Sequence, residues 1–116
     1  METYVMKIFV QEGHALDFVA PAGGVTSGVP LLVGTVLVIP ATTAKEGETF
    51  AGWIEGVYTL PCATGTAWAT PCLPIYWDDA NKRVTTTANG NTKIGMTGAA
   101  KVAADAAGNV KLIPTV

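Results

Sequence analysis

The side chains best suited to chemistry in this 116-residue chain are one histidine, two cysteines, one serine and one pair of adjacent aspartates. His14 and Ser27 would need an acid partner and an activated hydroxyl to act as a triad. Ser27 instead lies in a glycine-rich turn that lacks the nucleophile-elbow pattern. A lone histidine in a loop is typical of a surface residue. The sequence therefore predicts no enzyme and no catalytic residues.

The adjacent carboxylates of Asp78 and Asp79 suit either a Ca²⁺ site or acid–base work. They stand in the segment DDANK, between two strand-like runs, and the alternating oxygen ligands and terminal glutamate of an EF-hand are missing. Asp and Asn side chains also bond nearby backbone N–H groups and so favour turns. We expect Asp78, Asp79 and Asn81 to form a structural hairpin turn, with no metal site.

Cys62 and Cys72 lack the CxxC spacing of many zinc sites, and the only histidine lies far away in the sequence. Two states remain open from the sequence alone. The thiols are reduced and partly buried, as is usual in a cytosolic protein, or a disulfide closes the short loop between them. Neither state predicts a metal or a cofactor.

The three tryptophans, Trp53, Trp68 and Trp77, suit either a stacking platform for nucleic acid or a protein core. The seven Lys and Arg residues are scattered and the net charge is −2, so no basic patch is visible. The sequence therefore predicts no nucleic-acid partner. Trp68 stands in a loop-like segment, and we expect it to be the exposed tryptophan and a possible subunit contact.

The composition indicates one small folded domain. Hydrophobic residues make up 49% of the chain and charged residues 14%, which argues against disorder. Thr and Val are abundant, and Gly and Pro are spread along the chain, which favours short strands over long helices. We expect a mostly β fold, a small compact β-barrel or sandwich of short strands with tight hairpins. Residues 1–10 are expected to be an N-terminal arm or edge strand, and residues 11–116 a single β domain.

The most apolar stretch, residues 29–41, is too short to cross a bilayer and contains Gly and Pro. No basic region followed by an apolar run stands at the N-terminus, so no secretory signal is predicted. The sequence predicts no membrane association. It also predicts that the protein is made in the cytoplasm.

The apolar pattern predicts a series of short strands separated by turn signals. The segment 30–39 is expected to be one strand, buried on both faces and bent at Gly34. The segment 62–71 is expected to be a loop or one helical turn. Tight turns are expected at 21–28, 78–81 and 89–91. The expected strands are residues 4–10, 15–19, 30–39, 49–60, 73–77, 82–88, 92–96, 99–103 and 110–114.

Three segments, taken in order, resemble a family of small tailed-phage and prophage proteins. They are FVQEGHALDFVAPAGGVTSGVPLLVG, GETFAGWIEGVYTLP and PIYWDDANKRVTTTANGNTKIGM. The family was long known as a domain of unknown function and is now described as capsid decoration, or cement, proteins. The resemblance covers roughly residues 7–113. Its most specific parts are Tyr76-Trp77-Asp78, the run from Arg83 to Thr87, and Asn91-Thr92 through Gly95. The two cysteines and the hydrophobic run TVLVIPAT depart from the family pattern.

The resemblance implies a mechanical function on the virion. Such proteins bind the outer surface of the expanded phage head, typically as trimers, and clamp neighbouring major-capsid subunits together. Ligands that bind only one state of a protein stabilise that state, and many copies turn a modest energy per site into a large one. The resemblance thus implies the major capsid protein as partner, a homotrimer, and a protein made in the bacterial host cytoplasm. The alternative is a phage tail or receptor-binding accessory β module.

The N-terminal segment suits a capsid-binding role because it is apolar and lies at a chain end. A strand of this kind adds to an exposed sheet edge on a partner. The alternative is an ordinary edge strand of this domain. The residues that we expect to bind the capsid through this arm are Tyr4, Val5, Met6, Lys7, Ile8 and Phe9.

Overall fold

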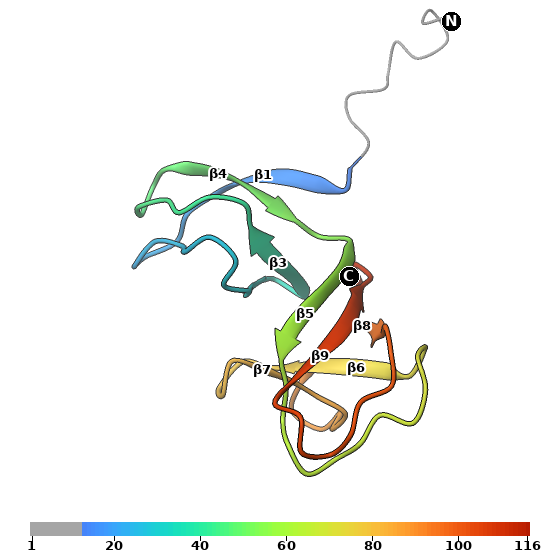
Figure 1. The fold of residues 1–116 in the computed structure, drawn as a ribbon. Coiled ribbons are helices and arrows are strands. Elements are labelled where there is room, and N and C mark those ends of the chain that lie inside the picture. Colours follow the sequence, from blue (N-terminus) through green and yellow to red (C-terminus); the bar gives the residue numbers. More distant parts are fainter. Residues whose placement is uncertain (1–12) are drawn as a thin grey trace, which may run out of the picture.

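The computed structural model describes residues 13–116, which contain nine β-strands and no helix (Figure 1). The strands are β1 Ala15–Val19, β2 Leu31–Val33, β3 Val36–Pro40, β4 Thr49–Trp53, β5 Gly56–Pro61, β6 Pro74–Asp78, β7 Arg83–Thr85, β8 Thr92–Thr97 and β9 Ala107–Leu112. The expected mostly β class is confirmed. The N-terminal strand expected at residues 4–10 lies outside the described residues, so the arm and its boundary stay predictions.

The strands form two antiparallel sheets, and each occupies one end of the molecule (Figure 1). Sheet I has the order β1-β4-β3-β2, and sheet II has the order β5-β9-β8-β6-β7. The chain completes sheet I before it enters sheet II. The two edge strands of sheet II come together at one isolated bridge, Cys62 to Val84, but no closed barrel is formed by residues 13–116.

The expected single strand over residues 30–39 is wrong, because the chain reverses at Gly34. β2 and β3 are antiparallel partners, with Val33 opposite Val36. Gly34 has a φ of +63°, a left-handed conformation that glycine adopts without steric cost and that two-residue hairpin turns require. The expectation that this segment is buried on both faces holds for β3, in which only the first residue is partly exposed.

The expected strand over residues 49–60 is also wrong, because it divides between the two sheets. β4 ends at Trp53 and pairs with β1 and β3, whereas β5 begins at Gly56 and pairs with β9. Gly56 has a φ of +118°, which redirects the chain at this point. Gly56 thus marks the change of sheet, whereas Gly52 lies inside β4, opposite Leu16 and Pro40.

The remaining strands agree in part with the strands expected from the sequence. β6 and β7 form the hairpin around Asp78–Asn81, although β7 is shorter than expected. The Asn89–Asn91 turn leads into β8, which pairs with β6 and β9 and not with β7, so this turn closes no hairpin. The expected strand at 99–103 is wrong: only Lys101 makes a bridge, to Trp68. β9 begins earlier than the strand expected at residues 110–114, and residues 62–71 form a loop without a helical turn.

Two hydrophobic clusters lie inside the described part of the chain, and β3 belongs to both. Leu37 and Ile39 point to the larger cluster, which contains the inward residues of sheet II. Val38 points the other way, to a smaller cluster inside sheet I. Because side chains alternate along a strand, β3 joins the two sheets through a shared core.

Candidate functional site

The turn between β6 and β7 contains the aspartate pair, and its contacts are local. The carboxylate of Asp78 accepts hydrogen bonds from the backbone N–H of Asn81 at 3.3 Å and from its Nδ2 at 2.7 Å. Asp79 Oδ1 accepts from Lys82 Nζ at 2.8 Å and from Trp77 Nε1 at 3.1 Å. These bonds hold the pKa of both carboxyl groups below its ordinary value. The two carboxyl groups therefore stay ionised, and their hydrogen bonds stabilise the turn.

The expectation that Trp68 is the exposed tryptophan is wrong. Its side chain is 2% exposed and belongs to the larger core, whereas Trp53 is 43% exposed. Trp68 and Lys101 exchange two backbone hydrogen bonds, at 2.9 and 3.0 Å, and this non-local pairing brings the loop down onto sheet II. The subunit contact that we expected from Trp68 thus loses the exposure on which it rested.

Lys101 is a buried cation that the sequence pattern did not single out. It is 7% exposed, and its Nζ donates to the carbonyl oxygens of Thr66, Val102 and Asp105 at 3.2, 3.1 and 3.0 Å. The same nitrogen lies 5.4 Å from the centre of the Trp68 ring, a cation–π distance. Lys101 therefore ties the loop before β6 to the loop before β9.

Both cysteines are free, so the disulfide alternative is excluded. Cys72 is exposed and Cys62 is buried. Burial raises the pKa of the Cys62 thiol, and nearby Lys101 lowers it by a smaller amount. A thiol with a raised pKa is a poor nucleophile because little thiolate forms. Cys62 is therefore poorly suited to covalent chemistry.

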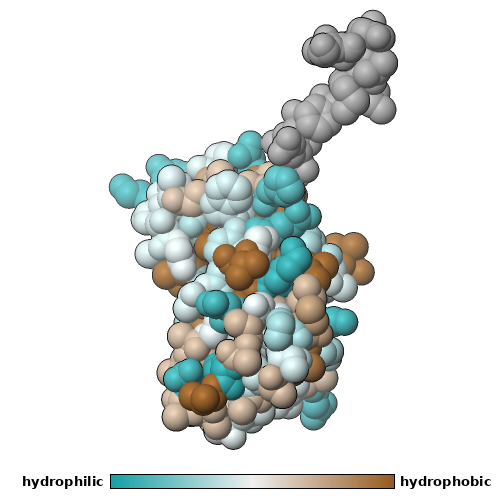
Figure 2. Space-filling view, turned by 45° about the vertical axis from the view of Figure 1, so that its right-hand side comes forward, coloured by the Kyte–Doolittle hydropathy of each residue, from teal (hydrophilic) through white to brown (hydrophobic). Residues whose placement is uncertain are grey.

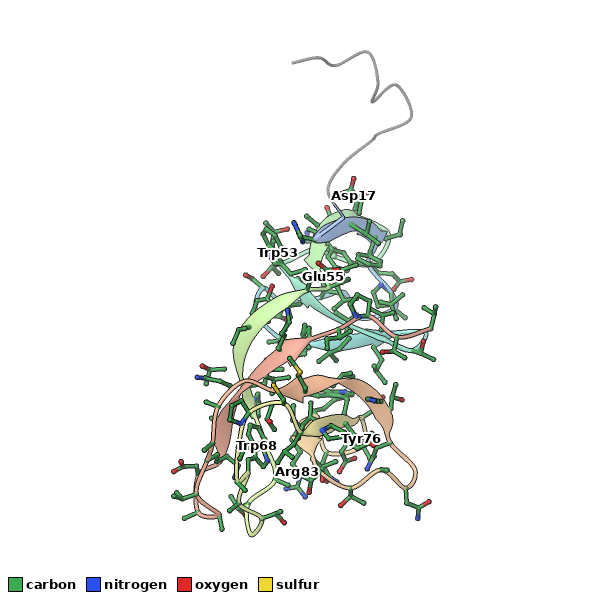
Figure 3. The ribbon with its side chains drawn as sticks, turned by 90° about the vertical axis from the view of Figure 1, so that its right-hand side faces the viewer. Asp17, Trp53, Glu55, Trp68, Tyr76 and Arg83 are labelled. Atoms are coloured by element: carbon green, nitrogen blue, oxygen red, sulfur yellow. The ribbon has the colours of Figure 1, made fainter. Side chains whose placement is uncertain are left out.

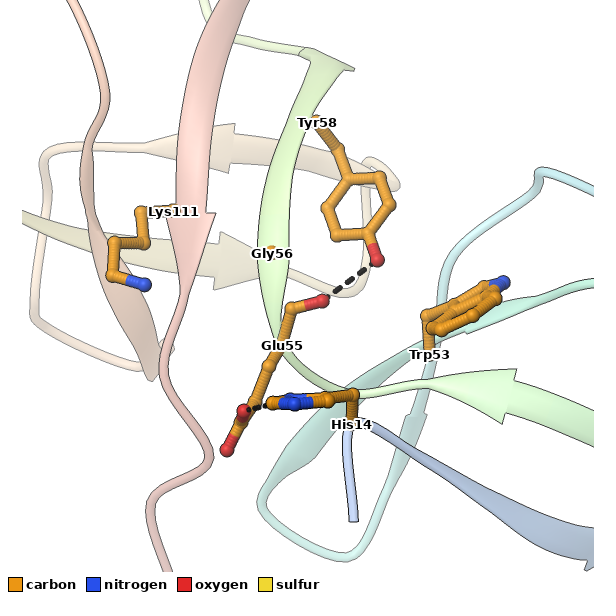
Figure 4. A pocket seen from close by; sticks show the side chains of 6 residues that line it. All are labelled: His14, Trp53, Glu55, Gly56, Tyr58 and Lys111. Carbon is orange, nitrogen blue, oxygen red and sulfur yellow. Dashed lines mark hydrogen bonds and ion pairs between the residues drawn. The ribbon is translucent and has the colours of Figure 1, made fainter. Parts of the chain in front are cut away.

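A groove of about 440 Å³ lies where the chain passes from sheet I to sheet II (Figure 4). Glu55 stands at its centre and accepts a hydrogen bond from His14 Nδ1 at 2.8 Å. The Tyr58 hydroxyl donates to the Glu55 carbonyl oxygen at 2.7 Å, and Trp53 and Lys111 complete the lining. Gly56 permits this arrangement, because a Cβ there would meet the Tyr58 hydroxyl at 3.0 Å.

The β1 and β4 part of one face of sheet I is open to solvent, whereas at β3 the same face is covered by sheet II, because Ile39 lies opposite Trp53 and is buried in the larger cluster. We call the open part the sheet-I face; it consists of the β1 and β4 residues that lie opposite one another in register, Ala15–Trp53, Asp17–Ala51 and Val19–Thr49. Directly opposite residues share a face of a sheet. Asp17, Val19 and Trp53 on this face are exposed, and Asp17 and Trp53 are seen at the same end of the molecule in Figure 3.

Sheet II also has an outer face that is open to solvent. We call it the sheet-II face; its centre is a row of residues that lie opposite one another across four strands, Pro74, Met96, Lys111 and Val57. Val57 is 60% exposed, and Ile113, two residues beyond Lys111, is exposed as well. An open sheet face is usually polar, so this row is unusually apolar. Apolar side chains are visible at mid-height on the surface in Figure 2.

Other classes of site are not supported by the described residues. Within residues 13–116, no three His, Cys, Asp or Glu side chains come together to hold a metal ion. No helix in that range is long and apolar enough to cross a membrane. The capsid-binding residues expected in the arm, Tyr4 to Phe9, lie outside the described range. The groove and the two open sheet faces are candidate functional features of the described residues.

Comparison with known protein families relates the chain to a family. A family model described as phage cement protein matches residues 10–112. The match includes the groove and both sheet faces, apart from Ile113, and it begins after the expected capsid-binding residues of the arm. No curated protein and no solved structure matches the chain.

Proposed function

Because the chain belongs to the phage cement protein family and its role is associated with the phage capsid, we propose that it binds the outer surface of the expanded head and stabilises it. The observation that carries the proposal is the family match over residues 10–112. That range contains two open sheet faces with apolar residues at their centres, which suit adhesion better than catalysis. The proposed partner is the major capsid protein, and the proposed role is structural rather than enzymatic.

The stabilisation follows from binding to one state of the shell. A protein that binds the expanded lattice and not the compact precursor lowers the free energy of the expanded lattice alone. Every copy contributes the same amount, so a modest affinity per site suffices. We propose that the protein is made in the bacterial host cytoplasm and acts on the virion as a homotrimer.

We propose in addition that the N-terminal arm, Tyr4 to Phe9, binds the capsid as an added strand. Its sequence YVMKIF is apolar apart from Lys7. An extended segment of this kind can add to an exposed sheet edge through main-chain hydrogen bonds. Deletion of residues 1–10 tests this role. The truncated protein should keep its circular dichroism spectrum and lose most of its affinity for heads. Unchanged affinity would assign capsid binding to the folded part instead.

The test of the proposed function is co-sedimentation with purified heads that lack the protein. We expect saturable binding to expanded heads, little binding to unexpanded precursors, and a higher disruption temperature for decorated heads. Protein that leaves expanded heads bare and instead binds isolated tails would contradict the proposal and favour the tail or receptor-binding module.

A further inference from the structure

The two open faces differ in charge in a way that suits contact between copies. Residues 13–55, which form sheet I, carry four carboxylates and one lysine, so their net charge is −3. Residues 56–116, which form sheet II, carry three aspartates and five Lys or Arg residues, so their net charge is +2. The protein is therefore acidic at one end and basic at the other, and unlike ends of two copies attract.

The same complementarity holds at the centre of each face. On the sheet-I face, Asp17 is the only charged residue of the register pairs, and Ala15, Val19, Ala51 and Trp53 surround it. Neither His14 nor Glu55, the hydrogen-bonded pair of the adjoining groove, belongs to these register pairs. Asp17 therefore stands as one negative charge on a mainly apolar surface.

On the sheet-II face, Lys111 is the only charged residue of the four-strand row. It is flanked by Val57 and Met96, with Ile113 directly after the end of β9. Lys111 has no ion pair with any residue in 13–116, and the same is true of Asp17. Asp17 is thus the one charge of the sheet-I register pairs, whereas the sheet-II face presents Lys111, at the edge of the groove that contains Glu55, and Lys93, which lies opposite Tyr76. The charges at the centres of the two faces are opposite in sign.

We propose that the sheet-I face of one copy packs on the sheet-II face of a second copy, with Asp17 of the first facing Lys111 of the second. The apolar residues around the two charges would be buried together, which supplies the driving force. The charge pair would fix the orientation, because a shifted contact leaves a charge against apolar surface. This inference rests on the proposed function, since it supplies the subunit contact of the proposed oligomer.

Charge reversal tests this contact on the full-length protein by sedimentation equilibrium. Wild-type protein should self-associate, and Asp17→Lys or Lys111→Asp alone should each raise the dissociation constant by roughly tenfold or more. The double variant Asp17→Lys/Lys111→Asp should restore most of the lost affinity, because the pair is rebuilt with its signs exchanged. Glu46→Lys is the matched control: it makes the same charge change in an exposed turn of sheet I and should leave association nearly unchanged.

Carbodiimide cross-linking provides an independent readout, because it joins a carboxylate to an amine only when the two groups are in contact. We expect a cross-linked dimer band on denaturing gels whose peptides connect Asp17 to Lys111, and loss of this link in either single variant. Wild-type protein that remains monomeric and yields no such link would overturn the inference. So would single variants that associate as wild type does.

Head co-sedimentation separates this inference from the proposed function. If Asp17→Lys binds heads but does not self-associate, both proposals are supported. If self-association through these faces is found and heads stay bare, the face contact stands and the proposed function fails. Folding of each variant is checked by its melting temperature, because both positions are exposed and should tolerate the change.

Discussion

Sheets I and II differ in what stabilises them. Sheet II encloses the larger cluster, in which Trp68 and Trp77 are almost fully buried. Sheet I encloses a smaller cluster with one large aromatic residue that is fully buried, Phe50. Its strands are joined by glycine turns, such as Gly34, whose backbone conformation other residues reach at a cost. We infer that sheet II is the stable scaffold and that sheet I depends more on its turns and on the shared strand β3.

Truncation of Trp68, compared with truncation of Trp53, should show the largest difference in the free energy of unfolding between the two sheets. Trp68→Ala removes a large side chain from the sheet II core, and it should lower the free energy of unfolding by about 3–5 kcal/mol. Trp53→Ala on the open sheet-I face is the matched control and should cost about 1 kcal/mol or less. Urea unfolding followed by circular dichroism measures both. Equal costs for the two variants would contradict the assignment of Trp68 to the core.

Loss of the buried cation should have the next largest effect. Lys101→Met keeps the length of the side chain but removes three hydrogen bonds from the ammonium group and leaves the Thr66 carbonyl oxygen without a donor, so it should lower the free energy of unfolding by about 2–3 kcal/mol. Lys93→Met, at an exposed position of β8, should change it by about 0.5 kcal/mol or less. The same urea titration reports both values. A neutral Lys101→Met would mean that apolar packing fully replaces the ammonium contacts.

A substitution in the β2–β3 turn tests how far sheet I depends on backbone geometry. A Cβ at Gly34 would meet nothing within 4 Å, so Gly34→Ala should be penalised only for its positive φ, by about 1–2 kcal/mol. Gly34→Asn should cost less, because Asn tolerates this conformation. Thermal melting of the two variants makes the comparison. Identical melting temperatures for wild type and Gly34→Ala would show that the turn contributes little to sheet I.

The smallest expected effect is that of acid on the β6–β7 turn. The folded pKa of Asp79 lies below its ordinary value of 3.8, first because of the bond from Lys82 and then because of that from Trp77. Its contribution is therefore present above pH 3.8 and is lost as the pH falls through the folded pKa. Because the pair is exposed, the change should be small. Melting temperatures measured below about pH 4 should fall slightly less for Asp79→Asn than for wild type.

The sequence predicted local elements well where one strand and its turn are contiguous. Ala15–Val19 was predicted with the bounds that β1 has, and the Asp78–Asn81 connection lies between β6 and β7 as expected. These segments are read from alternation and from turn residues, both of which are local signals. The mostly β class follows from the same signals.

The sequence could not predict features that depend on contacts between distant segments. The apolar run from Thr49 to Leu60 continues across the point where the chain changes sheet, so its pattern gave one strand in place of two. Trp68 is buried by its pairing with Lys101, 33 positions further along the chain. The two open faces likewise depend on register: Asp17 and Lys111 are ordinary charged residues until the strands that surround each of them with apolar neighbours are known.

A cryo-electron microscopy map of the virion that contains this protein tests the central claim most directly. We predict density of this two-sheet shape at regularly repeated positions on the outer surface of the expanded head, in contact with the major capsid protein. Heads without this density, together with density of the same shape at the tail, would contradict the account.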